Sequence, residues 1–198
     1  MITPAVNRSD QHLWGIRLIL APLLFLISSF FWQEGEYGII SGTLVTLGSV
    51  FWIPAFTGLF ARLKSRMPTY ATWGLLVAIY GCVSGSAFGI RGIYAEVYSI
   101  SKQSLLQMAD THPFAFNLTM FWPEPLFPLS LLILGVNLMR KKVTPTWTGV
   151  LLCIGAIGFP LSRIARVEYV AHLADVLLFL PVAYIGLTYL TRPSAISR

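Results

Sequence analysis

Charged residues are scarce in this chain of 198 residues: they make up 11% of it, whereas 56% of the residues are hydrophobic. Soluble globular domains are about 25% charged and about 45–50% apolar. The mean hydropathy of the chain is +0.71. A soluble domain of this length cannot remove so much apolar surface from water. The composition therefore excludes an ordinary soluble protein and indicates an integral membrane protein.

Cysteine and histidine are also rare, and their scarcity excludes several kinds of site. Two cysteines exclude a disulfide scaffold and a four-cysteine metal centre. A haem held between helices needs two facing histidines, but of the three histidines only His172 lies in an apolar segment. Schiff-base chemistry within the membrane needs a lysine there, and all the lysines lie between apolar segments. We therefore predict no cofactor.

Long apolar runs dominate the chain, and six of them approach the roughly 20 residues that a membrane-spanning helix needs. The first ends in Phe30, Phe31 and Trp32, which are too bulky for a signal-peptide cleavage site, so we interpret it as a retained helix. The sequence predicts one all-α domain, residues 1–198, folded as a bundle of six transmembrane helices. The predicted spans are 13–32, 37–61, 70–90, 121–139, 147–162 and 170–190.

The connections between the spans are short, as antiparallel neighbours require, except for the long loop 91–120. Within that loop, the amphiphilic stretches 93–100 and 103–108 are expected to lie as interfacial helices. The sequence does not decide whether this loop forms a lid. The fourth span begins among Pro123, Pro125 and Pro128, which predicts irregular first turns.

Basic residues are distributed unevenly between the two predicted membrane sides. With the N-terminus in the cytoplasm, ten basic residues fall inside and four outside, which satisfies the positive-inside rule. Both termini are then cytoplasmic, and all acidic residues except Asp10 fall outside or in the outer half. The formal charge of +6 reflects these basic loops, so we predict no nucleic-acid partner. The basic residues of the outer side are Arg91, Lys102, Arg163 and Arg166.

A group of charged residues is predicted to gather at the outer end of the bundle. In the sixth span, Glu168, His172 and Asp175 are spaced i, i+4, i+7 and therefore share one helical face. An ionised carboxylate as deep as Asp175 is costly unless it is paired or hydrated, so it is expected to face a cavity or the bundle interior. The predicted ligand-binding or proton-coupling residues are Arg91, Glu96, Glu124, Arg163, Arg166, Glu168, His172 and Asp175.

This charged group has three interpretations. It can form an outward-facing pocket whose arginines suit an anionic ligand, such as a carboxylate or a lipid phosphate, with His172 and Asp175 coupling to protons. It can instead be a structural network of ion pairs that pins the helix ends. A metal held by Glu168, His172 and Asp175 is the third interpretation, but this spacing lacks the specificity of a His-Glu-x-x-His motif, so no metal is predicted.

Small residues recur every three or four positions in the third span and form a continuous stripe. Such stripes let helices approach closely in a lipid environment. The stripe predicts a helix–helix contact inside the bundle, a homo-oligomer interface or the wall of a ligand groove. Its members are Gly74, Ala78, Gly81, Gly85 and Gly89.

The hairpin Leu131–Phe159 combines a leucine-glycine run, a basic turn at 140–142, the pattern Pro145-x-Trp147-x-Gly149, and the pair Gly155 and Gly158. It resembles a hairpin in a family of uncharacterised small bacterial membrane proteins with a domain of unknown function. The resemblance covers under a quarter of the chain. It implies a six-helix protein of a bacterial inner membrane and carries no activity.

Three functions follow from these features as hypotheses. The first is a small binding or transport protein with an outward-facing polar pocket. The second is a structural or accessory subunit that associates with itself or with a partner membrane protein. The third is an intramembrane, metal-assisted hydrolase, and the sequence favours the two hypotheses that involve no enzyme. The identity of a ligand, the oligomeric state and any direction of transport are not determined by the sequence.

Overall fold

The structure is a computed structural model that describes residues 8–32 and 35–191. Helices and the turns between them make up this range, and it contains no β-strand. The elements in chain order are α1 (Arg8–Ser29), α2 (Ile39–Ala61), α3 (Pro68–Val97), α4 (Lys102–Thr111), α5 (Pro113–Phe116), the π-helical segment η1 (Asn117–Phe121), α6 (Leu126–Arg140), α7 (Thr146–Ala165) and α8 (Glu168–Thr191).

Six helical segments are long and apolar enough to cross a membrane, which confirms the predicted all-α bundle of six membrane-spanning helices. This is the architecture of a multi-pass integral membrane protein. The segments are His12–Ser29, Ile39–Ala61, Pro68–Val97, Pro113–Arg140, Thr146–Ala165 and Glu168–Thr191.

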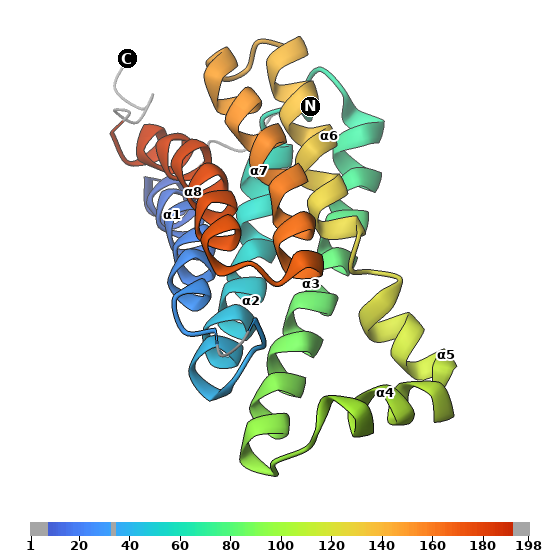
Figure 1. The fold of residues 1–198 in the computed structure, drawn as a ribbon. Helices are drawn as coiled ribbons and strands as arrows, with labels where there is room; N and C mark the ends of the chain where they lie inside the picture. Colours follow the sequence, from blue (N-terminus) through green and yellow to red (C-terminus); the bar gives the residue numbers. More distant parts are fainter. Residues whose placement is uncertain (1–7, 33–34, 192–198) are drawn as a thin grey trace, which may run out of the picture.

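The six spans pack in a closed circle, in the order α1, α2, α3, α6, α7, α8 and back to α1. The α2–α3 and α6–α7 turns lie at one end of the bundle, while the end of α3 and the short helix α4 project from the other (Figure 1). Aromatic side chains fill the middle of the circle: Trp52 and Phe56 are fully buried, and Phe127 packs against both.

Helix α3 is longer than predicted, because it continues to Val97 rather than ending at residue 90. The extra turns are held against the turn that precedes α2. A Cβ atom on Gly92 would lie 2.5 Å from the Tyr37 carbonyl oxygen, and Glu96 accepts a hydrogen bond from the Ile39 backbone N–H. The helix ends before Ser99, whose φ of 52° is left-handed.

The rest of the predicted loop 91–120 is also largely helical. Helix α4 covers the stretch 103–108, where the sequence predicts an interfacial helix, and α5 and η1 follow it. Regular α6 begins only at Leu126, after turns at residues 122–125. The prolines at 123 and 125 cannot donate backbone hydrogen bonds, which accounts for the irregular start of this span.

The stripe of small residues on α3 packs against helices of the same chain. A Cβ atom on Gly89 would lie 2.6 Å from the carbonyl oxygen of Gly42 on α2, and one on Gly81 would lie 2.6 Å from the backbone nitrogen of Phe127 on α6. Gly85 faces Ser49 of α2, and Ala78 is fully buried. The stripe therefore makes a contact inside the bundle, where α2 and α6 cover it, and self-association of the protein stays a hypothesis.

Candidate binding site

Two cavities lie one behind the other at the end of the bundle from which α4 projects. The inner cavity, of about 110 Å³, is surrounded by α1, α2, α3, α6 and α7. The outer cavity, of about 320 Å³, lies between the end of α3, α4 and the turn between α7 and α8. Seven residues line both cavities and are called the shared ring below: Glu36, Tyr37, Phe88, Arg91, Glu124, Arg163 and Arg166.

The inner cavity has mainly aromatic walls below the shared ring. The rings of Phe25 and Phe159 stack with centroids 5.9 Å apart, and Phe127 packs against both at 5.5 and 5.3 Å. Gly81 and Ser84 of α3 complete the opposite wall. The space exists because the α3 residues at this level have small side chains.

The outer cavity is bounded by one face of α4, which presents Leu105, Leu106 and Ala109 to it, together with Lys102. This helix begins at Ser101, whose hydroxyl accepts a hydrogen bond from the Ser104 backbone N–H and so caps it. The outer cavity adjoins the inner cavity at the shared ring.

Glu36, a member of the shared ring, is the centre of a cluster of ion pairs that also includes Lys102 of the outer cavity. Its carboxylate lies 3.8 Å from Arg91 and 3.6 Å from Lys102, and it also pairs with Arg166. Glu124 lines both cavities but forms no ion pair with any residue that the structure describes. Three cations, Arg91, Lys102 and Arg166, thus face two carboxylates, Glu36 and Glu124, which leaves a surplus of one positive charge at this site.

Arg166 reaches the shared ring from an unusual backbone position. It ends α7 with φ 54° and ψ 40°, a left-handed conformation that glycine adopts more readily. Its guanidinium donates a hydrogen bond of 3.2 Å to the Gly35 carbonyl oxygen and pairs with Glu36. The side chain of Arg166 therefore ties the α7–α8 turn to the α1–α2 turn across the mouth of the inner cavity.

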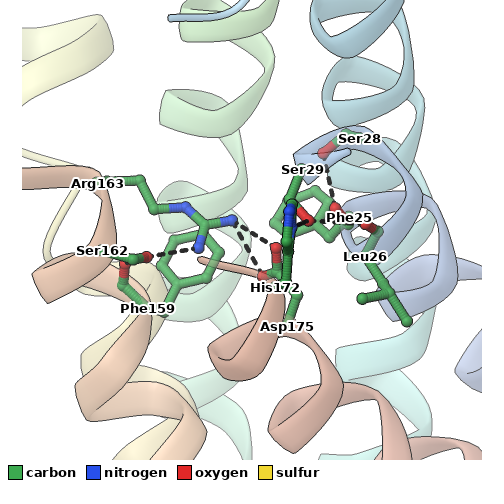
Figure 2. A network of polar contacts seen from close by, with 9 residues as sticks. All are labelled: Phe25, Leu26, Ser28, Ser29, Phe159, Ser162, Arg163, His172 and Asp175. Atoms are coloured by element: carbon green, nitrogen blue, oxygen red, sulfur yellow. Dashed lines mark hydrogen bonds and ion pairs between the residues drawn. The ribbon is translucent and has the colours of Figure 1, made fainter. Parts of the chain in front are cut away.

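Arg163 forms a buried ion pair with Asp175 of α8. One guanidinium nitrogen donates to both carboxylate oxygens at 3.0 and 2.9 Å, and the exposed fractions of the two side chains are 12% and 0% (Figure 2). The other terminal nitrogen donates to the Ser162 hydroxyl at 2.9 Å. The guanidinium also lies 3.7 Å from the centroid of the Phe159 ring. This pair is neutral as a whole, so it adds no net charge to the inner cavity.

Tyr37 stands beside Arg163 in the turn before α2. Burial raises the pKa of the Tyr37 hydroxyl, and the charge of the nearby Arg163 opposes that shift without cancelling it. The hydroxyl therefore keeps its proton at neutral pH and can donate a hydrogen bond at the shared ring.

His172 lies between α8 and α1, outside both cavities. Its Nδ1 atom is 2.9 Å from the Ser29 hydroxyl oxygen, and its ring stacks on Phe30 with centroids 4.1 Å apart (Figure 2 shows the contact with Ser29). The Ser29 hydroxyl also donates to the Leu26 carbonyl oxygen at 2.8 Å. Proton coupling through His172 and Asp175 stays a prediction.

The structure brings together only part of the predicted charged group. Four of its residues line both cavities: Arg91, Glu124, Arg163 and Arg166. Asp175 lines neither cavity and is connected to them only by its ion pair with Arg163.

Two of the predicted acidic residues lie elsewhere, and for different reasons. Glu96 is used to cap the start of α2. Glu168 is exposed in the first turn of α8, where a negative charge suits the helix dipole. The shared helical face therefore does not bring Glu168 to the site.

Glu36, Lys102 and Tyr37 belong to the site but were not predicted for it. Their charge and their place on the predicted outer side are the only features of the sequence that point to Glu36 and Lys102 as site residues. Their meeting depends on the α1–α2 turn and α4 lying next to the end of α3.

The described residues contain no group of three histidine, cysteine or acidic side chains that could hold a metal ion. Asp175 pairs with Arg163 and His172 contacts Ser29, while Glu168 is exposed. Glu168, His172 and Asp175 therefore form no such group among the described residues, and the metal-assisted hydrolase stays a hypothesis.

Several donors around the inner cavity have no acceptor within the part of the chain that the structure describes. They are the indole N–H of Trp32 and the Nε–H groups of Arg91 and Arg163, all buried. Buried donors without a partner are costly and call for an explanation, such as a bound acceptor.

Comparison of the chain with protein-family models, with curated proteins and with solved structures finds no match. The resemblance of the hairpin Leu131–Phe159 to a bacterial six-helix family stays a prediction. A function for this membrane protein must therefore be argued from the shared ring and its two cavities.

Proposed function

We propose that this protein is a small membrane binding or transport protein, and that it takes a small anionic ligand at the shared ring. The observation that carries the proposal is the convergence of Arg91, Lys102 and Arg166 on the single carboxylate of Glu36, at the junction of two cavities. A purely structural network would need neither the surplus charge nor the space beside it.

The chemistry of the ring favours an oxyanion. Guanidinium groups bind carboxylates and phosphates through strong, charge-assisted hydrogen bonds. Arg163 is already neutralised by Asp175, so Arg91 and Arg166 are the groups that can accept a second anion. The Nε–H of Arg91 has no acceptor among the described residues and is one further donor. The Glu36 carboxylate then competes with the ligand for these cations, and a bound ligand replaces part of its ion pairs.

The site is proposed to face away from the cytoplasm. The basic turns at 62–66 and 140–142 lie at the end of the bundle opposite the cavities, and the positive-inside rule assigns such turns to the cytoplasmic side. Both termini are then cytoplasmic. The resemblance of the hairpin supports a bacterial inner membrane as the location.

Anion binding by the purified protein tests this proposal. Methyl phosphate is titrated into the protein in detergent or nanodiscs by calorimetry, and native mass spectrometry records any mass that copurifies. Arg91→Gln and Arg166→Gln are each expected to weaken methyl phosphate binding by about tenfold, the value of one charge-assisted hydrogen bond. Lys64→Gln, an exposed cation at the opposite end, is the control and should bind as the native protein does. Folded variants of both arginines with unchanged affinity contradict the proposal.

Glu36→Gln should have the opposite effect on the same measurement. Removal of the carboxylate frees Arg91, Lys102 and Arg166 for the ligand, and we expect affinity for methyl phosphate to rise about two- to fivefold, as exposed ion pairs of this kind allow. Glu168→Gln is the matched control, because Glu168 is exposed and lies outside the site. Weaker binding in Glu36→Gln would show that Glu36 contacts the ligand as a partner and does not compete with it.

A further inference from the structure

We infer that the ligand is an amphiphile: an oxyanion held at the shared ring, attached to one apolar group the size of a benzene ring that occupies the inner cavity. This inference rests on the proposed function and adds the chemical class of the ligand. It follows from the size of the inner cavity, the nature of its walls and the position of the free charges.

The inner cavity has the size of one small apolar group. Its volume is about 110 Å³. An engineered apolar cavity of about 150 Å³ in another protein binds benzene. The inner cavity therefore fits a phenyl ring or a short branched alkyl group, and it excludes a long acyl chain that enters lengthwise.

The walls of the inner cavity match an aromatic group. Phe25, Phe127 and Phe159 present ring faces and edges within 5.3–5.9 Å of one another, the separations at which aromatic rings pack well. Ser49 donates its hydroxyl to the Val45 carbonyl oxygen at 2.8 Å, so it does not require a polar ligand. An apolar group is favoured in these surroundings.

The positions of the charged side chains determine the orientation of the bound ligand. Arg91 and Arg166 lie at the mouth of the inner cavity, with Lys102 on the outer side, whereas the deeper Arg163 is neutralised by Asp175. An anion at the ring meets the free cations, and a group attached to it can extend inward only into the aromatic cavity. The indole N–H of Trp32, which is 8% exposed and has no acceptor among the described residues, supplies a further donor to a ligand acceptor at this level.

A pair of ligands with the same headgroup tests the inference. Phenyl phosphate and methyl phosphate are titrated separately into the native protein by calorimetry. Burial of the phenyl group should make phenyl phosphate bind at least about tenfold more tightly. The bulkier 4-tert-butylphenyl phosphate should lose this advantage, because the inner cavity cannot hold the added group. Benzoate and acetate form a second pair, with a carboxylate headgroup, in which the same preference is expected.

A variant that fills the inner cavity identifies where the phenyl group lies. Ser84 is 3% exposed and lines this cavity, so Ser84→Leu should bring the ratio of the affinities for phenyl phosphate and methyl phosphate close to one. Ser86→Leu, on the same helix but outside both cavities, is the control. Cys82→Leu fills the same cavity from a neighbouring position and replaces Ser84→Leu if that variant does not fold.

The outcomes separate this inference from the proposed function. Equal affinity for phenyl and methyl phosphate overturns the inference but leaves anion binding intact. A preference for phenyl phosphate that persists in folded Ser84→Leu and Cys82→Leu variants also overturns it. If neither phosphate nor carboxylate binds the native protein, the proposed function itself fails.

Discussion

Arg163 and Asp175 show how a single pair of residues connects the candidate site to the rest of the bundle. Arg163 lines both cavities, and its counter-charge Asp175 lies on α8, which contributes no residue to either cavity. The charged guanidinium of Arg163 is stable at this depth only because the Asp175 carboxylate and the Ser162 hydroxyl accept its hydrogen bonds. From its depth, Asp175 is predicted to face a cavity or the bundle interior. The structure buries Asp175 in the interior, and its partner Arg163 lines the two cavities.

Loss of the carboxylate at position 175 should destabilise the protein strongly. Asp175→Asn leaves the Arg163 charge buried without a counter-charge, and breaking such a pair costs about 3–5 kcal/mol of unfolding free energy. Thermal unfolding in detergent, followed by circular dichroism, measures the loss.

Two comparison variants show whether that loss comes from the unpaired charge. The double variant Arg163→Met/Asp175→Leu removes both charges and should recover most of the stability. Glu168→Gln changes an exposed carboxylate on the same helix and should have no effect. An Asp175→Asn protein as stable as the Glu168→Gln protein would show that the ion pair contributes little.

At the scale of the elements, α3 organises the site. Its small residues bring α2 and α6 close, and they leave the inner cavity open at Gly81 and Ser84. Its last turns extend past the rest of the bundle (Figure 1). Together with α4, these turns line the outer cavity. The same helix therefore provides both tight packing and the space for a ligand.

Gly89→Ala should destabilise the contact between α2 and α3. The added Cβ atom would lie 2.6 Å from the backbone carbonyl oxygen of Gly42, which cannot move aside as a side chain can. Overpacking of this kind costs about 1–3 kcal/mol. The change in unfolding free energy, measured by chemical or thermal denaturation in mixed micelles, reports it.

Gly58→Ala is the matched control, because it makes the same chemical change on α2. Its added Cβ atom would meet only Leu18, at 3.8 Å. Alanine is the better helix former by up to about 1 kcal/mol, so this variant should be as stable as the native protein or more so. Equal losses in the two variants would contradict the close approach at Gly89.

At the scale of the whole molecule, the closed circle of six helices determines which turns share an end. Residues 30–32 and 35–38, the segment between α3 and α6, and the α7–α8 turn meet at the end that carries the cavities. The basic residues of the two remaining turns are at the opposite end. The charge asymmetry along the chain thus becomes an asymmetry between two faces of the bundle, with the cavities on the less basic face.

Cysteine labelling tests the proposed orientation. Asp110→Cys on α4 and Arg140→Cys at the end of α6 place single thiols at exposed positions on opposite ends, in a background without Cys82 and Cys153. In intact cells, a membrane-impermeant maleimide should label Asp110→Cys, while Arg140→Cys should react only after permeabilisation. The reverse pattern would put the cavities on the cytoplasmic side. The cysteine-free background, which should remain unlabelled, controls for nonspecific reaction.

Properties that depend on neighbouring residues along the chain could be predicted from the sequence. Runs of apolar residues specify spans because every backbone group in lipid must be bonded within its own helix, so the number of spans and the disturbance at the prolines near Leu126 could be predicted. The close packing of α3 also followed from its spacing of small residues. The end of α3 at Val97 could not be predicted from the sequence, because it depends on contacts with the turn at Tyr37.

Which charged side chains contact one another depends on the packing of the whole bundle. Glu36, Arg91 and Arg166 are far apart in the sequence, and their contact results from closure of the helical circle and from the left-handed backbone at Arg166. Glu168 has the helical spacing of a site residue, yet α8 begins there and leaves it exposed. A helical face is a local property of the chain, whereas a binding site is formed by long-range packing, which no single segment specifies.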